Sequence, residues 1–251
     1  MFDFSNKRVF VTGGARGIGA ATALAFRVRG ARVAVGARHL ASYDAFVARN
    51  GVQDVHPIIG DIRNRAAAQG VVAAAVEVLG GLDVLVNSAG VFAEVPVIEV
   101  TQEHWDETLE TNLGGTFFCS QAALPALKAS GGNIVNVASD AGLVGYPNGC
   151  AYSAAKGGVV NLTRAMAVEL ARDVRVNCVC PGNVETDMIL NAAAASGDPE
   201  RYLEKARARA HTQRMVLPME VAAAILYLAS REAASTTGTA LAIDGGGTAG
   251  F

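Results

Sequence analysis

Short runs rich in β-branched residues alternate along this chain with alanine-rich segments of helical period. The runs that predict strands are Arg8 to Val11, Arg32 to Val35, Val55 to Ile59, Asp83 to Val86, Asn133 to Val137, Val174 to Val179 and Ala240 to Ile243. Helices are expected near Gly17 to Arg29, Arg63 to Leu79, Thr101 to Lys128, Cys150 to Ala171 and Pro218 to Ser230. This alternation predicts an α/β fold: a doubly wound, seven-stranded parallel sheet between two helical layers, forming a single domain over residues 1–251.

One segment, Met188 to Met215, interrupts the alternation. It is polar and helix-prone, and it stands between the sixth strand and the next core helix. Connections longer than about 12 to 15 residues in compact domains are usually functional or disordered. We therefore expect a mobile substrate flap at residues 188–215, with a plain surface insertion as the alternative.

Composition excludes several classes of partner. Half of the residues are apolar (51%) and the formal net charge is −2, so a basic surface for nucleic acid or an acidic membrane is not expected. The first seven residues are short and polar for a secretion signal, and no apolar run reaches the roughly 18 residues of a membrane span. The expectation is a soluble cytoplasmic protein.

The four cysteines, Cys119, Cys150, Cys178 and Cys180, show no C-x-x-C spacing. We expect them to pack as small apolar side chains, and no metal site is expected.

A glycine-rich stretch, Gly13-Gly14-Ala15-Arg16-Gly17-Ile18-Gly19, follows the first predicted strand and opens the first predicted helix. No lysine follows these glycines as a P-loop would require, and the G-x-G-x-x-G pattern is absent. Glycine nevertheless permits a tight turn and close approach, and the helix N-terminus offers free N–H groups to a pyrophosphate. The stretch favours dinucleotide binding, with a bare strand-to-helix turn as the alternative.

Polar or glycine-rich residues recur where later strands end. They are Asp61, the run Asn87 to Gly90, Ser139, and the run Pro181 to Asn183. The carboxyl ends of parallel strands share one edge of the sheet, where doubly wound folds bind ligands. A single site is therefore expected to collect these residues.

Tyr152 and Lys156 lie four residues apart near the start of a predicted helix, which places them on one face. A lysine beside a phenol favours the phenolate and lowers its pKa. Ser139 could hydrogen-bond a substrate oxygen while Tyr152 gives or takes its proton. Taken singly, Ser139 could end a strand, Asp61 could form a turn and Asn112 could cap a bend.

With these motifs, the sequence resembles the short-chain dehydrogenase/reductase family in its compact branch of about 250 residues, a family with a Rossmann-like fold. The resemblance covers nearly the whole chain: Thr12 to Gly19, Asp61, Asn87 to Gly90, Asn112, Ser139, Tyr152 with Lys156, Pro181 to Thr186 and Ile243 to Gly246. It implies that Tyr152 is the general acid/base and that Ser139 orients the carbonyl. It also implies that Lys156 lowers the Tyr152 pKa and binds the nicotinamide ribose, and that Asn112 holds a water in the proton relay.

The resemblance also implies a set of cofactor-binding residues. Asp61 and Asn87 would flank the adenine and its ribose, while Val184 and Thr186 would meet the carboxamide and pyrophosphate. The full set is Gly13, Arg16, Gly17, Ile18, Gly19, Arg38, Asp61, Ile62, Asn87, Ala89, Gly90, Tyr152, Lys156, Pro181, Gly182, Val184 and Thr186. Two departures from the family pattern are Ser88, where a second asparagine is usual, and the turn before Val176, which is one residue short.

The residues after the second strand indicate which nicotinamide cofactor is used. An Asp or Glu about 20 residues beyond the glycine loop marks NAD, but Ala37 and Arg38 stand there. Arg38 offers a planar donor group for a 2′-phosphate, and Arg16 resembles the second basic residue of NADPH-preferring members. We expect NADP(H), with relaxed NAD(H) use as the alternative.

The substrate is expected to be a small or medium apolar ketone or its secondary alcohol. The predicted pocket residues are Phe92, Leu143, Tyr146, Met188, Ile189 and Met215. A 3-oxoacyl carrier-protein reductase is the alternative, which Arg172 favours and Ser130 and the net charge weaken. A dinucleotide sensor without turnover is a second alternative, and the intact Ser139, Tyr152 and Lys156 argue against it. By resemblance, the long helices are expected to pair subunits into a homotetramer, with a dimer second.

Overall fold

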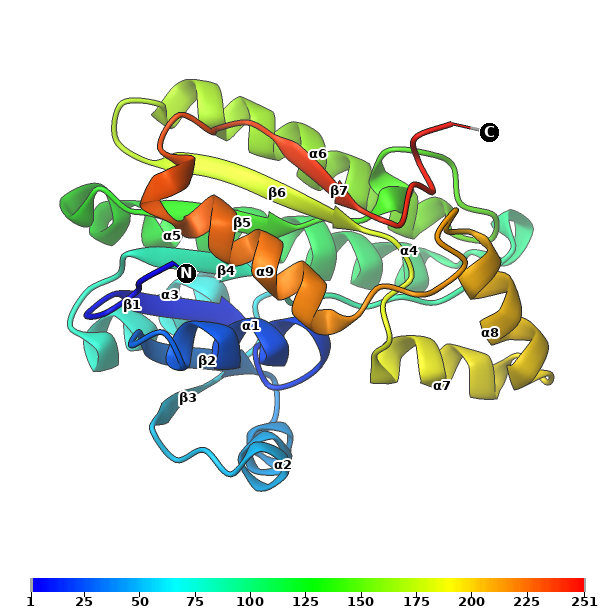
Figure 1. Ribbon diagram of the computed structural model, residues 1–251, viewed down its shortest axis with the longest axis horizontal. Coiled ribbons are helices and arrows are strands. Elements are labelled where there is room, and N and C mark those ends of the chain that lie inside the picture. The colour runs from blue at the N-terminus through cyan, green and yellow to red at the C-terminus, as the bar shows by residue number, and fades with distance from the viewer. Residues whose placement is uncertain (1, 251) are drawn as a thin grey trace.

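A computed structural model describes residues 2–250. Its parallel sheet has the strand order β3-β2-β1-β4-β5-β6-β7 (Figure 1). The strands are β1 (Arg8–Thr12), β2 (Arg32–Ala37), β3 (Val55–Ile59), β4 (Val84–Asn87), β5 (Asn133–Val137), β6 (Arg175–Pro181) and β7 (Ala240–Ile243). The prediction of a doubly wound, seven-stranded parallel sheet is confirmed.

Helices cover both faces of this sheet. They are α1 (Gly17–Arg27), α2 (Leu40–Asn50), α3 (Arg65–Leu79), α4 (Gln102–Leu109), α5 (Gly115–Ser130), α6 (Cys150–Leu170), α7 (Asp187–Ala195), α8 (Pro199–Ala208) and α9 (Pro218–Ala229). Sequence reasoning missed α2, in which Phe46 is the one buried residue. A helix with so narrow an apolar face has little of the periodic signal by which helices are recognised.

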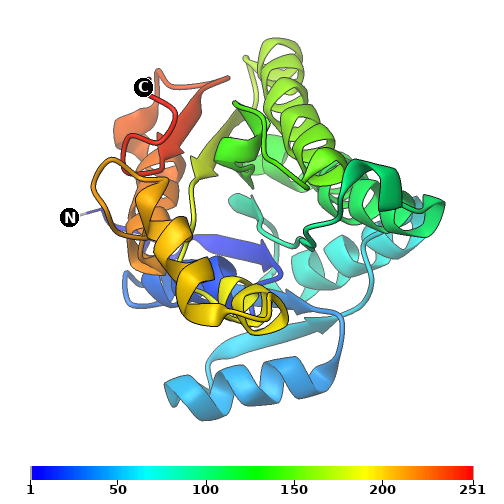
Figure 2. The same ribbon diagram turned by 90° about the vertical axis from the view of Figure 1, so that its right-hand side faces the viewer.

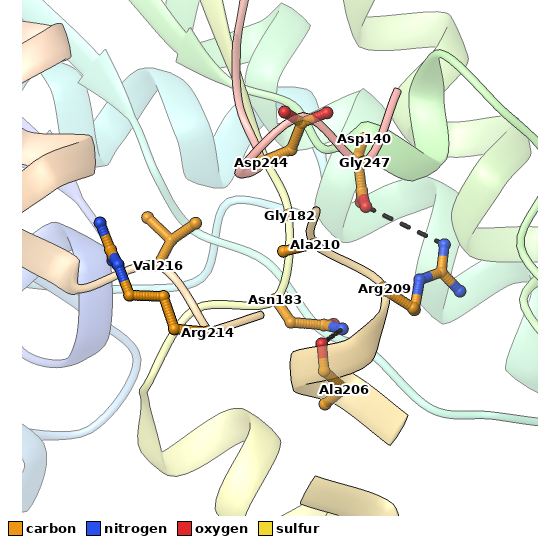
Figure 3. A pocket seen from close by; sticks show the side chains of 10 residues that line it. All are labelled: Asp140, Gly182, Asn183, Ala206, Arg209, Ala210, Arg214, Val216, Asp244 and Gly247. Atoms are coloured by element: carbon orange, nitrogen blue, oxygen red, sulfur yellow. Dashed lines mark hydrogen bonds and ion pairs between the residues drawn. The ribbon is translucent and has the colours of Figure 1, made fainter. Parts of the chain in front are cut away.

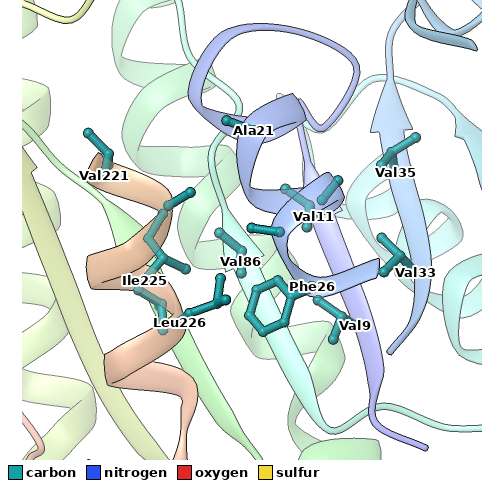
Figure 4. Close-up of a cluster of buried hydrophobic side chains, with 14 of the residues drawn as sticks. Val9, Val11, Ala21, Phe26, Val33, Val35, Val86, Val221, Ile225 and Leu226 are labelled. Carbon is teal, nitrogen blue, oxygen red and sulfur yellow. The ribbon is translucent and has the colours of Figure 1, made fainter. Parts of the chain in front are cut away.

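Alternate residues of each strand point to opposite cores because successive side chains of a strand leave the sheet on opposite faces. Val9 and Val11 of β1 pack with Phe26 of α1 and Ile225 of α9 (Figure 4). Phe10, between them, belongs to the other core, which α3, α5 and α6 cover. The two cores fix the sheet and hold the ends of its strands in place.

The prediction of one continuous helix from Thr101 to Lys128 is wrong, because the helix is interrupted. A π-helical turn, η2 (Glu110–Gly114), separates α4 from α5. The Asn112 side chain lies in this turn, and its Nδ2 donates to the carbonyl oxygens of Thr108 and Val91, each at 3.0 Å. Turns of this kind are frequent at functional sites.

Residues 188–215 form most of α7 and all of α8, which lie beyond the end of the sheet to which β6 points (Figures 1 and 2). Pro199 stands in the first turn of α8, and the Asp198 side chain accepts from the Arg201 N–H at 3.2 Å. Ile189 and Met215 join a small core with Ala206. The segment is therefore built as a helical pair with its own apolar contacts.

Cys119, Cys178 and Cys180 are buried, as a small apolar role requires. Cys150 is exposed at the first residue of α6, so that prediction is wrong for this cysteine. Within residues 2–250, no helix combines the length and the apolar composition that a membrane crossing requires.

Candidate active site

The glycine loop connects β1 to α1 at the carboxyl edge of the sheet. Gly13 has φ +62°, and a Cβ there would lie 2.7 Å from Ala89 Cα. A Cβ at Gly19 would collide with the carbonyl oxygen of Gly13. Gly17 has φ +54° and faces Thr186, whose Cγ2 would lie 3.3 Å from an added Cβ. The loop therefore needs glycine, and it brings bare backbone to the N-terminus of α1 as a bound pyrophosphate requires.

The loop after β4 is tied to the glycine loop by Thr12, whose Oγ1 accepts from the N–H groups of Ser88 (3.1 Å) and Ala89 (3.2 Å). Asn87 points inward. Its Nδ2 donates to Ser120 Oγ and Asn136 Oδ1, each at 2.9 Å. Because this side chain is buried, a dinucleotide would meet Asn87 through its backbone.

The loop after β3 carries Asp61 and Ile62. Arg63 Nε donates to Asp61 Oδ2 at 2.8 Å, and Arg63 Nη2 lies 2.7 Å from the same oxygen. This hydrogen bonding by Arg63 lowers the pKa of Asp61. Ile62 fills the space where a Cβ on Gly115 would stand. The loop therefore rests against the start of α5, with an ionised carboxylate at its tip.

Ser139 follows β5, and its hydroxyl is held by its neighbours. Ser139 Oγ donates to Asp140 Oδ1 at 2.9 Å and accepts from the Ala141 N–H at 3.2 Å. Burial raises the pKa of Asp140, while the Ser139 hydroxyl and the charge of Arg209 oppose the rise. A carboxyl group thus stands directly behind the serine expected to orient the substrate.

Tyr152 and Lys156 share one face near the start of α6, as predicted. Lys156 Nζ lies 5.6 Å from the centre of the Tyr152 ring and donates to the Val137 carbonyl oxygen at 2.8 Å. Burial lowers the pKa of Lys156 to about 8. Burial also raises the pKa of Tyr152, and the neighbouring Ser139 hydroxyl is the group that opposes this rise. Lys156 is not among the groups that act on the Tyr152 pKa here, and desolvation of the phenol is the largest effect.

Asn112 reaches the same place from the π-helical turn. Its Oδ1 accepts from the Val91 N–H at 3.1 Å, so its amide pairs with both backbone groups of that residue. A Cβ on Gly90 would lie 2.7 Å from Asn112 Oδ1 and 3.7 Å from Lys156 Nζ. Gly90 therefore lets the chain pass close to these two side chains.

The loop after β6 supplies the remaining predicted cofactor residues. The Gly182 N–H donates to the Ile243 carbonyl oxygen at 3.1 Å, and Val184 is buried and bridges to Val216. Thr186 begins α7 opposite the glycine loop. Arg16 and Arg38 are both exposed, at the start of α1 and just after β2.

Of the predicted pocket residues, Phe92 and Tyr146 lie beside the catalytic candidate. The Phe92 ring packs edge to face with the rings of Tyr152 and Tyr146. The distances between ring centres are 4.9 Å to Tyr152 and 5.9 Å to Tyr146. Leu143 and Met188 are exposed. Ile189 and Met215 are buried in the small core of the 188–215 segment, so their side chains support that segment from within.

Sequence reasoning missed a group of polar side chains around Tyr146. Glu94 Oε1 accepts from the hydroxyls of Tyr202 (2.8 Å) and Tyr146 (3.4 Å). The Arg209 guanidinium lies over the Tyr146 ring, 4.1 Å from its centre, and 4.0 Å from Asp140 Oδ2. Their only signal in the sequence was the polar character of the 188–215 segment.

A small polar cavity of about 20 Å³ lies next to this group (Figure 3). Its charged and amide lining residues are Asp140, Asn183, Arg209, Arg214 and Asp244. This volume suits a single water molecule. Tyr152 and Lys156 are not among the residues that line it.

Comparisons with known proteins agree with this geometry. A family model described as Enoyl-(Acyl carrier protein) reductase matches residues 13–248. The chain is 39% identical to trans-4-hydroxycyclohexanecarboxylate dehydrogenase of Sinomonas cyclohexanicum, covering 98% of this chain and 94% of that one. It is 38% identical to a 3-oxoacyl-acyl-carrier-protein reductase of Thermotoga maritima, covering 96% and 97%. The solved structure of Thermoplasma acidophilum aldohexose dehydrogenase superposes with a TM-score of 0.91 at 31% identity, covering 100% of this chain and 98% of that one.

Proposed function

Since the chain belongs to the short-chain dehydrogenase/reductase family, we propose that it is an NADP(H)-dependent oxidoreductase that interconverts a small or medium-sized, largely apolar ketone and its secondary alcohol. The observation that carries the proposal is the meeting of Ser139, Tyr152 and Lys156 beside the glycine loop at one edge of the sheet. The nicotinamide, when bound, supplies or accepts the hydride. Tyr152 gives or takes the proton of the substrate oxygen, and Ser139 orients that oxygen.

The glycine loop fits a dinucleotide because three of its positions exclude a side chain or need a positive φ. Gly13, Gly17, Ile18 and Gly19 would hold the pyrophosphate through backbone N–H groups. The loop residues listed above, from Asp61 to Gly90 and from Pro181 to Thr186, would hold the adenine, the riboses and the carboxamide. Lys156 would bind the nicotinamide ribose.

The preference for NADP(H) rests on Arg38 and Arg16. Both guanidinium groups are exposed near the glycine loop, and the acid that would bind the ribose of NAD is replaced by Ala37. A hydrogen bond to a charged group is worth about 1.5 to 3 kcal/mol, or roughly 10- to 150-fold in affinity.

The double substitution Ala37→Asp with Arg38→Leu tests this preference. The new carboxylate would accept from the ribose hydroxyls of NAD and repel the phosphate of NADP, so we expect the kcat/KM ratio of NADPH to NADH to invert. Arg65→Leu, at an exposed arginine of α3, is the control and should leave the ratio unchanged. A wild-type enzyme that prefers NADH, or a ratio that barely moves in the double variant, would contradict the assignment.

A 3-oxoacyl carrier-protein reductase is the second candidate, because a relative with that name is 38% identical over nearly the whole chain. Assays with an acetoacetyl thioester and with simple ketones of equal chain length separate the two. A kcat/KM at least tenfold higher for the thioester would favour the second candidate.

We also propose that the 188–215 segment moves over bound substrate and that the chain forms a homotetramer through α4, α5 and α6. Trp105 of α4 and Phe117 of α5 expose 40% and 37% of their surface, and Val168 of α6 exposes 83%. Light scattering at micromolar concentration should give about four times the chain mass of 25.8 kDa. A monomer would exclude this assembly.

A further inference from the structure

Arg209 is placed as a ligand-binding side chain rather than as a structural one. Its guanidinium has five N–H donors, and its side chain is 34% exposed. Within residues 2–250 these donors make no hydrogen bond: Asp140 lies at 4.0 Å, and the remaining contact is the face of the Tyr146 ring. Stacking fixes the plane of the guanidinium and leaves its edge free to bind an acceptor.

An acceptor lies at the hydroxyl end of the same side chain. Glu94 Oε1 takes hydrogen bonds from Tyr146 and Tyr202, which hold the carboxylate in place. Only one of its two oxygens is engaged in these bonds, so the other can accept from a ligand hydroxyl. Tyr146 therefore carries a fixed donor group over its face and a fixed acceptor group at its hydroxyl.

Two chains of side-chain contacts connect Arg209 and Glu94 to the catalytic candidates. Through the aromatic side chains, Tyr146 contacts Phe92, and Phe92 contacts Tyr152. Through the polar side chains, the Asp140 carboxyl group accepts from Ser139 Oγ and faces Arg209 with its other oxygen (Figure 3). Asp140 thus connects Ser139 to Arg209, and Phe92 connects Tyr152 to Tyr146. We expect the carbon atoms beside a substrate oxygen held by Ser139 and Tyr152 to lie along these contacts.

We infer that the substrate carries a second hydroxyl group beside the reacting carbinol, and that Arg209 and Glu94 recognise this hydroxyl as donor and acceptor. The inference rests on the proposed function and adds to it one feature of the substrate. The carbon skeleton still packs on Phe92 and Tyr146, as an apolar substrate would.

The charges near Arg209 favour a neutral substrate over an anionic one. Glu94, Asp140 and Asp244 are acidic, and Asp140 and Asp244 line the cavity that Arg209 also lines. Arg214, the second arginine there, is engaged with Glu220 through two hydrogen bonds of 2.7 and 2.8 Å. A substrate carboxylate would therefore add to an excess of negative charge, whereas a hydroxyl can use both the donor and the acceptor.

Three substrates that share a four-carbon skeleton test the inference: 2,3-butanediol, 2-butanol and 3-hydroxybutyrate, each oxidised with NADP⁺ and with NAD⁺. We expect the wild-type kcat/KM to be at least tenfold higher for the diol than for either of the others. In Arg209→Met, kcat/KM for the diol should fall roughly 10- to 150-fold, the value of a hydrogen bond to a charged group. The kcat/KM for 2-butanol should change less than threefold when each enzyme is measured on the pH-independent plateau of its own profile. Glu94→Gln keeps an acceptor for both tyrosines. It should also lower kcat/KM for the diol more than kcat/KM for 2-butanol.

Arg207→Met, at an exposed arginine of α8 two residues before Arg209, is the matched control and should act as wild type. Equal losses for diol and mono-alcohol in Arg209→Met, or no preference for the diol in wild type, overturn the inference. Preference for 3-hydroxybutyrate that Arg209→Met abolishes also overturns it and assigns Arg209 to a carboxylate. Turnover of 2-butanol without a preference for the diol contradicts the inference and leaves the proposed function intact. If no alcohol is oxidised with either cofactor, the proposed function and the inference are both wrong.

Discussion

Ser139 donates its hydroxyl proton to Asp140 Oδ1 over 2.9 Å, so the serine beside the catalytic phenol is coupled to a buried carboxyl group. The charge of Asp140 raises the pKa of Tyr152, adding to the effect of burial. Arg209 lies 4.0 Å from the same carboxyl and offsets part of its charge.

Asp140→Asn should therefore shift the pH dependence of alcohol oxidation. The substitution removes a negative charge near Tyr152, which favours the phenolate and lowers the pH at which the rate rises. Arg209→Met should shift the same limb to higher pH. Profiles of kcat/KM against pH for the two variants check this, and shifts in one common direction would contradict it.

Tyr152→Phe should remove the proton donor while leaving the binding site intact. We expect kcat to fall by about 10²- to 10⁴-fold, as for loss of a general acid/base, with the dissociation constant for NADPH unchanged within about threefold. Tyr227→Phe, at a 39% exposed tyrosine of α9, is the control. Turnover retained in Tyr152→Phe would rule out this role for Tyr152.

Gly13→Ala should weaken cofactor binding because the new Cβ would lie 2.7 Å from Ala89 Cα in the loop after β4. Gly51→Ala is a matched control: Gly51 has φ +63°, against +62° at Gly13, but no atom lies within 4 Å of an added Cβ. Both variants should lose about 1 kcal/mol or more of stability from the left-handed backbone. Fluorescence titration with NADPH should show lower affinity for Gly13→Ala alone, and equal affinities would refute the role of this close approach.

The pKa of Lys156, lowered by burial to about 8 from 10.5, links folding to pH. The folded protein binds this proton less tightly than the unfolded chain, so wild-type stability should rise between about pH 8 and 10.5. Lys156→Met lacks this group. Its stability relative to wild type should therefore be highest at pH 8 and below, and fall by up to about 3 kcal/mol by pH 10.5. Denaturant unfolding of wild type and Lys156→Met across this pH range checks the trend. Lys128→Met, at the partly exposed Lys128, is the control. A difference in unfolding free energy between wild type and Lys156→Met that does not depend on pH would contradict the prediction.

The strands could be predicted because they are rich in β-branched residues, and the central strands β1, β4, β5 and β6 are buried along most of their length, which leaves one dominant local signal. Their ends then located Ser139 and the glycine loop at one edge, since parallel strands all end there. Helical spacing paired Tyr152 with Lys156. The group around Tyr146 could not be predicted in this way. Glu94 lies 108 residues before Tyr202 in the sequence, and glutamate and arginine are common surface residues. Only the folding of α8 against the loop after β4 brings them together.

The π-helical turn Glu110–Gly114 could not be predicted either. The stretch holds no proline, and the adjacent Gly114 and Gly115 do not distinguish a π-helical turn from an ordinary end of a helix. Such a turn holds one residue more than a regular helical turn of the same rise, so it resets the angular phase between α4 and α5. If the same residues were wound as one regular α-helix, the residues of α5 would be rotated by about 100° relative to α4. Cys119, Ala123 and Leu127 would then turn out of the core. The π-helical turn therefore takes up one extra residue and so keeps these three side chains on the face of α5 that packs in the core.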